Sequence, residues 1–161
     1  LPEVERGEDY DCLIYFKRRS SEELEQVISF LNQRGITYKL LKYGSYKPEQ
    51  VNELSSKSKC CFLLNGTESQ GIAVQEIMSL GVPIIAWDIK TWEDQGPEWS
   101  VPATSVPFWD ERCGEKFYDI NDMEKTFDKF YATIDTYNPK EFVEDNLSFE
   151  CSIKTLLDIL R

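Results

Sequence analysis

The sequence lacks histidine altogether and is poor in basic residues. Its 161 residues include 18 lysines and arginines against 29 aspartates and glutamates, which gives a net charge of −11 at neutral pH. Proteins that bind nucleic-acid backbones need clustered basic side chains, so this balance argues against nucleic acid as a partner. A small anionic ligand in a local basic pocket is still compatible with it. The consecutive cations Lys17, Arg18 and Arg19 stand out against the acidic background.

The cysteines lack any CxxC spacing. There are five of them, an odd number at irregular intervals: Cys12, Cys60, Cys61, Cys113 and Cys151. Three of the five fall in apolar runs. This pattern predicts neither a zinc ribbon nor a disulfide framework, and we expect no metal site. Buried free thiols in a reducing compartment are the expected state, which favours a cytoplasmic location.

Long hydrophobic runs are also missing. No segment approaches the roughly 20 apolar residues of a membrane span, and no secretory signal is visible, so no membrane span is expected. The first residue is Leu1, which we interpret as the start of a processed chain or of a fragment. The acidic residues 1–10 are expected to form a linker or arm, and residues 11–161 a single domain.

Short apolar segments alternate with helical patterns along the rest of the chain. Continuous apolar runs predict buried strands at 12–16, 37–41, 60–64 and 82–87, with a weaker fifth strand at 104–108. The expected fold is therefore α/β: a doubly wound, Rossmann-like parallel sheet of about five strands flanked by helices, in one domain.

Capping and stop signals mark the predicted helices. Ser20 and Glu23 have capping-box spacing before an apolar stripe that ends near Gly35. Further helices are expected at 48–57, at 72–80, at 121–134 with Asn121 as its cap, and in a last helical region from Asn138 that ends in an apolar stripe.

Candidate ligand-binding residues follow the first and third predicted strands. In open parallel sheets, ligands bind beyond the carboxyl ends of the strands, where the strand order reverses, and this commonly falls between those two strands. Lys17–Arg19 follow the first strand. The glycine-bounded loop 65–71 follows the third and opens a helix. Cations facing a helix N-terminus suit an oligophosphate.

Two glutamates extend this candidate site. A carboxylate can accept two hydroxyl hydrogen bonds, which suits the recognition of sugars. Glu76, inside the helix, is expected to reach a ribose diol, and Glu68, in the loop, a hexose. Carboxylates beside phosphates are repulsive unless they contact neutral parts of the ligand. A sugar nucleotide provides both kinds of group.

The run from Thr67 to Ala86 resembles the E-x7-E signature of retaining GT-B glycosyltransferases, of the group 1 or family 4 type. It contains a glutamate, a Gly-aliphatic pair, a second glutamate, an apolar helix and a Gly-x-Pro-apolar segment. Residues 113–118 resemble the later glycine-then-strand segment of the same nucleotide-sugar-binding half. The resemblance covers about residues 11–160.

This resemblance implies roles for individual residues. Glu68 would face the donor sugar, with Lys17 and Arg18 as the electrostatic element at the diphosphate. The residues expected to bind the rest of the substrate are Arg19, Tyr43, Gly66, Thr67, Gln70, Gly71, Ile72 and Glu76.

The resemblance also implies a reaction. A UDP- or GDP-sugar donates its sugar with retention, and the departing phosphate helps to take the acceptor proton, so neither a cofactor nor a metal is expected. The missing histidine matches a mechanism without an imidazole base. Such enzymes have two halves, so an N-terminal acceptor-binding domain or a partner chain is expected to complete the site.

Two other classes stay open. One is a non-catalytic or NAD-binding α/β signalling module, similar to a TIR or receiver domain. A receiver needs an acidic cluster after the first strand, where this chain has three cations, but a TIR-like hydrolase would also use a glutamate. The other is a degenerate transferase half that is retained for assembly and binds no nucleotide.

Overall fold

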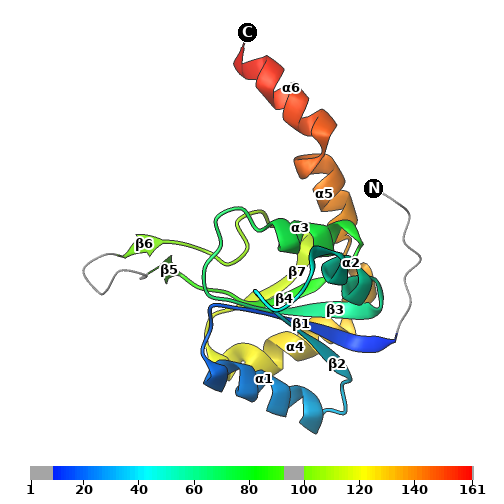
Figure 1. Cartoon of the computed structure of the whole chain (residues 1–161), viewed down its shortest axis with the longest axis vertical. Helices are drawn as coiled ribbons and strands as arrows, with labels where there is room; N and C mark the ends of the chain where they lie inside the picture. The colour runs from blue at the N-terminus through cyan, green and yellow to red at the C-terminus, as the bar shows by residue number, and fades with distance from the viewer. Residues whose placement is uncertain (1–8, 93–99, 161) are drawn as a thin grey trace.

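Five parallel strands form the central sheet of the domain (Figure 1). The computed structural model describes residues 9–92 and 100–160. The sheet order is β2-β1-β3-β4-β7, with every pair parallel. The strands are β1 (Tyr10–Lys17), β2 (Tyr38–Lys42), β3 (Ser58–Asn65), β4 (Ile84–Trp87) and β7 (Gly114–Phe117). The expected doubly wound α/β fold is confirmed, and the strand order reverses between β1 and β3.

Helices cover both faces of this sheet (Figure 1). One face packs against α1 (Ser21–Gln33) and α4 (Met123–Ala132). The other packs against α2 (Pro48–Ser56), α3 (Ile72–Ser79) and α5 (Pro139–Leu147). The remaining elements are β5 (Thr91–Trp92), β6 (Val101–Pro102), η1 (Glu111–Cys113), η2 (Ile120–Asp122), η3 (Ile134–Thr136) and α6 (Phe149–Ile159).

The alternation of side chains along the strands divides the core into two layers. In β1, Cys12, Ile14 and Phe16 pack towards α1 and α4, whereas Leu13 and Tyr15 pack towards α2, α3 and α5. Successive side chains of a strand point to opposite faces, so a strand buried on both faces must be apolar throughout. This explains why the strands were recognisable as continuous apolar runs.

The predicted start of the first helix is confirmed in atomic detail. The backbone N–H of Glu23 donates to Ser20 Oγ at 3.1 Å, and the backbone N–H of Ser20 donates to Glu23 Oε2 at 2.9 Å. These reciprocal bonds satisfy donors that a helix N-terminus otherwise leaves free. Pro48 begins α2 as expected. For α4, however, Asn121 is not the cap: it lies in η2, and Asp122 precedes the helix.

The fifth strand lies elsewhere than predicted. Residues 104–108 form no strand, and Gly114–Phe117 pairs with β4 instead. The reason is the buried carboxylate of Asp88, just after β4. It accepts hydrogen bonds from the Ser105 backbone N–H at 2.7 Å and from the Thr104 hydroxyl at 2.8 Å. Residues 104–105 are thus bound to a side chain and not to a neighbouring strand.

Four of the cysteines are buried free thiols, as expected, and Cys151 is half-buried. Burial raises the pKa of the Cys61 thiol well above its usual value, which keeps it protonated and unreactive. Within the described ranges, no helix is both long enough and apolar enough to cross a bilayer.

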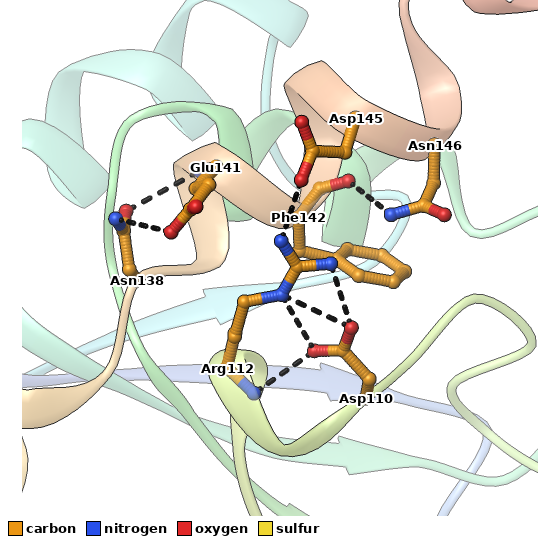
Figure 2. Close-up of polar contacts among 7 residues, drawn as sticks. All are labelled: Asp110, Arg112, Asn138, Glu141, Phe142, Asp145 and Asn146. Atoms are coloured by element: carbon orange, nitrogen blue, oxygen red, sulfur yellow. Dashed lines mark hydrogen bonds and ion pairs between the residues drawn. The ribbon is translucent and has the colours of Figure 1, made fainter.

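Arg112 attaches α5 to the loop before β7 (Figure 2). Its guanidinium donates to Asp110 Oδ2 at 2.8 Å and to Asp145 Oδ2 at 2.7 Å, and it lies 5.5 Å from the centre of the Phe142 ring. The Arg112 carbonyl also accepts from the Asn138 backbone N–H at 2.9 Å. The loop and the start of α5 are therefore joined through both backbone and side chains, above the buried Phe142.

The last helix, α6, extends away from the body of the domain (Figure 1). It has no buried residue. Large apolar side chains along it are between 41% and 75% exposed: Phe149, Ile153, Leu156, Leu157, Ile159 and Leu160. The apolar stripe predicted from the sequence is therefore real, but it is not part of this core.

The contrast between α5 and α6 is testable with one substitution on each. Phe142 is 6% exposed in the core and Phe149 is 75% exposed. Phe142→Ala should lower the free energy of unfolding by roughly 3–5 kcal/mol, because it empties a packed site. Phe149→Ala should change it by less than about 0.5 kcal/mol. Urea denaturation followed by circular dichroism measures both, and equal losses would show that α6 belongs to the folding unit.

Candidate functional site

The carboxyl ends of β1 and β3 lie side by side at the reversal of strand order. Their pairing continues to the last residue of each strand, with Lys17 opposite Asn65. The Gly66 backbone N–H then donates to the Lys17 carbonyl at 2.8 Å, which extends the contact into the following loops. The basic segment and the glutamate-bearing loop therefore leave the sheet at the same point.

Lys17 and Glu68 form an ion pair at this point. Lys17 Nζ lies 2.8 Å from Glu68 Oε2, and the two side chains are only 13% and 10% exposed. Lys17 Nζ also lies 4.8 Å from the centre of the Tyr43 ring, which is itself 52% exposed. The expected convergence of Lys17 and Glu68 is thus present in the geometry, and the Tyr43 ring lies beside Lys17.

The Glu68 carboxylate accepts further hydrogen bonds. Asn65 Nδ2 donates to Oε2 at 3.0 Å, and the Ser69 backbone N–H donates to Oε1 at 3.1 Å. Burial by itself raises the pKa of Glu68, but the bonds from Lys17, Asn65 and the Gly71 backbone outweigh it and hold the pKa below its usual value. Glu68 is therefore ionised at neutral pH.

Arg18 is held in an unfavourable backbone conformation. Its φ of 52° is the only positive value at a non-glycine residue in the described ranges. Its guanidinium Nη1 donates to Thr67 Oγ1 at 3.3 Å. Left-handed backbone at a residue with a side chain costs free energy and is concentrated at functional sites. Arg18 and Thr67, both expected at the site, are thus in contact across it.

Gly66 is required by the close approach of these two loops. A Cβ atom at this position would lie 1.9 Å from the carbonyl oxygen of Arg18. No side chain fits at that separation, so only glycine lets the two segments run together. Gly66 therefore sets how closely the two loops approach each other, and its expected contact with a substrate stays a prediction.

The loop 65–71 ends at the N-terminus of α3. Gly71 is the residue before the helix, with a left-handed φ of 72°. The Gln70 carbonyl accepts from Gln75 Nε2 at 2.6 Å, and Ile72 is 65% exposed. Ile72, the first residue of α3, is therefore exposed to solvent next to the Glu68 loop, whereas Val74 in the same turn is buried.

Glu76 lies one turn further along α3, on the same side as the exposed Ile72. Its side chain is half-buried and makes no hydrogen bond or ion pair with any described residue. The structure does not bring Glu76 into contact with Lys17 or Glu68. Its carboxylate is available to a ligand that extends along α3.

Arg19 turns away from the other two cations. Its guanidinium lies 4.8 Å from the centre of the Trp87 ring and 3.3 Å from Glu23 Oε1. Trp87 belongs to the core layer that faces α1 and α4. Arg19 is therefore not in contact with Glu68 or Thr67, so the geometry groups Lys17 and Arg18 but not Arg19 with the loop 65–71.

Sequence reasoning missed two features beneath the site. Asn65 is fully buried and holds the loop through Glu68 and through the Thr67 backbone N–H, which donates to its Oδ1 at 3.3 Å. The buried Tyr15 hydroxyl lies 3.1 Å from the Tyr46 hydroxyl. Burial, the Tyr46 contact and the Glu68 charge raise the pKa of Tyr15. A polar residue that ends an apolar strand was the available signal for Asn65.

A resident metal has no obvious ligand set in the described ranges, because they contain no group of three Cys, Asp or Glu side chains arranged to hold an ion. The chemistry of this site is that of a lysine, an arginine, backbone N–H groups and two carboxylates. Such groups bind phosphate and hydroxyl oxygens.

Comparison with known proteins does not identify the family. No protein-family model matches the chain, and no curated protein matches it significantly.

The contact between Gly66 and Arg18 predicts a large effect of one methyl group. Gly66→Ala should lower the free energy of unfolding by about 3 kcal/mol or more, since the methyl group clashes with the carbonyl group of Arg18, which is backbone and cannot turn aside. Gly44→Ala is the matched control, because a Cβ there meets nothing within 4 Å and only the φ of 79° opposes it. It should cost roughly 1–2 kcal/mol. Similar losses in thermal or urea denaturation would contradict the close approach.

Proposed function

We propose that this domain binds a nucleoside diphosphate sugar and acts as the donor-binding half of a retaining glycosyltransferase. The observation that carries the proposal is the 2.8 Å pair of Lys17 Nζ and Glu68 Oε2 at the reversal of strand order. A cation for phosphate and a carboxylate for hydroxyl groups stand together where open parallel sheets bind ligands.

The surrounding residues support a ligand that is charged at one end and rich in hydroxyls. Arg18, in its strained conformation, adds a second cation beside Thr67. The side chain of Glu76, separated from Glu68 by seven residues in the E-x7-E spacing, has no partner among the described residues. A carboxylate without a cation accepts hydrogen bonds from a diol, which fits a ribose.

The proposed chemistry needs no acid–base residue from this chain. The bond between the anomeric carbon and the diphosphate oxygen breaks, and the acceptor oxygen bonds to that carbon on the same face. The acceptor proton passes to the departing diphosphate. Lys17 and Arg18 stabilise the negative charge that builds up on the leaving group. Glu68 orients the sugar through its hydroxyl groups.

The acceptor would be bound by a second domain or by a partner chain. The exposed apolar stripe on α6 supports this part of the proposal, because contiguous apolar surface on a water-soluble domain marks a contact with another protein surface. A signalling module of the receiver type is disfavoured, since Lys17 occupies the end of β1 where such a domain needs carboxylates.

Calorimetric titration with UDP-glucose, UDP-N-acetylglucosamine, GDP-mannose and NAD tests the proposal. We expect one of the sugar nucleotides to bind and Arg18→Ala to weaken that binding by about tenfold or more, the effect of losing one charge-assisted hydrogen bond. The melting temperature should change little, because Arg18 is exposed and makes a single 3.3 Å side-chain hydrogen bond.

Lys59→Ala provides the matched control. Lys59 Nζ lies 2.9 Å from Asp11 Oδ1, so this ion pair also joins β1 to β3, but at the opposite end of the same strands. Its removal should leave nucleotide affinity unchanged. Binding of NAD alone, or equal affinities of wild type and Arg18→Ala, would refute the assignment.

A further inference from the structure

The Lys17–Glu68 pair affects which ligand the proposed site retains. Both Glu68 oxygens are already used by bonds within the domain: Oε2 accepts from Lys17 and Asn65, and Oε1 accepts from the Ser69 backbone. Lys17, the most buried cation of the proposed phosphate site, is therefore already neutralised from within. A phosphate that approaches Lys17 must displace Glu68 or lie beside its negative charge.

A nucleoside diphosphate without a sugar offers Glu68 no hydrogen-bond donor in place of Lys17. It takes Lys17 away from the carboxylate, and it carries no sugar hydroxyl at the diphosphate end that could donate to Glu68. Glu68 is then left largely buried, with one fewer donor and a second anion close by. A diphosphate that carries a hexose differs, because hydroxyl groups of the sugar can donate to the carboxylate in place of Lys17.

We infer that Glu68 competes with phosphate for Lys17, so that the site favours the sugar-bearing nucleotide over the bare nucleoside diphosphate. The inference rests on the proposed function and adds a specificity-determining role for Glu68. After the sugar has been transferred, Glu68 loses its hydroxyl partners, pairs with Lys17 again and promotes release of the diphosphate product. The same carboxylate thus holds the donor and expels the product.

Glu68→Gln tests this role, because the amide keeps the shape of the side chain and removes its charge. Calorimetry with UDP and with GDP should show that the variant binds its preferred bare nucleoside diphosphate about tenfold more tightly than wild type does. Affinity for the sugar nucleotide should stay the same or fall, so the ratio of the two affinities shifts towards the bare form. This ratio is not moved by a change in fold stability alone.

Glu76→Gln is the comparison variant. It removes the same charge from α3, but Glu76 does not touch Lys17. Its effect should be equal on the bare and the sugar-bearing nucleotide, which leaves their ratio at the wild-type value. A melting curve of each variant establishes that it is folded under the conditions of the titration.

The outcomes separate this inference from the proposed function. If wild type binds a nucleotide and Glu68→Gln binds the bare diphosphate no more tightly, Glu68 merely positions Lys17 and the inference is wrong. If Glu68→Gln is unfolded, the wild-type affinities decide: bare diphosphate bound as tightly as the sugar form overturns the inference. If neither wild type nor Glu68→Gln binds any nucleotide tested, both the proposed function and this inference are wrong.

Discussion

The pairing of β1 and β3 as far as their last residues is the constraint on which the site depends. Lys17 is held opposite Asn65, and the chain after Asn65 stays within hydrogen-bonding distance of the Lys17 carbonyl only because Gly66 has no side chain. From that register follow the short Lys17–Glu68 distance and the contact of Arg18 with Thr67. If this junction were looser, Lys17 and Glu68 would still follow neighbouring strands, but their side chains would not meet.

Most of the sheet was predictable because its strands are buried on both faces. Such strands must be apolar along the part that is buried on both faces, as are residues 12–16 of β1, residues 60–64 of β3 and all of β4. The edge strand β7 is not marked by an apolar run, since half of it is Glu115 and Lys116, which an edge position tolerates. Only the resemblance of residues 113–118 to a glycine-then-strand segment indicates it. The apolar residues near 104–108 were mistaken for that strand, because no sequence pattern reveals that the buried Asp88 binds Thr104 and Ser105.

The positions of site residues are predictable from the sequence only as far as the ends of the strands that carry them. Lys17 comes directly after one apolar run, and the loop that contains Glu68 comes directly after another. Because these two runs form neighbouring parallel strands, the topology of the sheet alone brings them together. Beyond the end of a strand, the alternation of side chains between the two faces no longer determines the direction in which each side chain points. Arg18 took a left-handed backbone, and Arg19 turned towards Trp87 on the other face. That choice depends on a stacking partner far along the chain, which local sequence does not encode.

The acidity of the whole molecule gives the ion pair its importance. With a net charge of −11, the domain does not attract anions over long distances. On the proposed function, a phosphate must therefore be held by contacts within the site, where Lys17 is already balanced by Glu68. The proposed site is thus an internal ion pair that a ligand would exchange for its own groups, and not an open positive pocket. Because phosphate alone would satisfy only the cation, the proposed selectivity must come from a neutral, hydroxyl-bearing part of the ligand that satisfies the carboxylate.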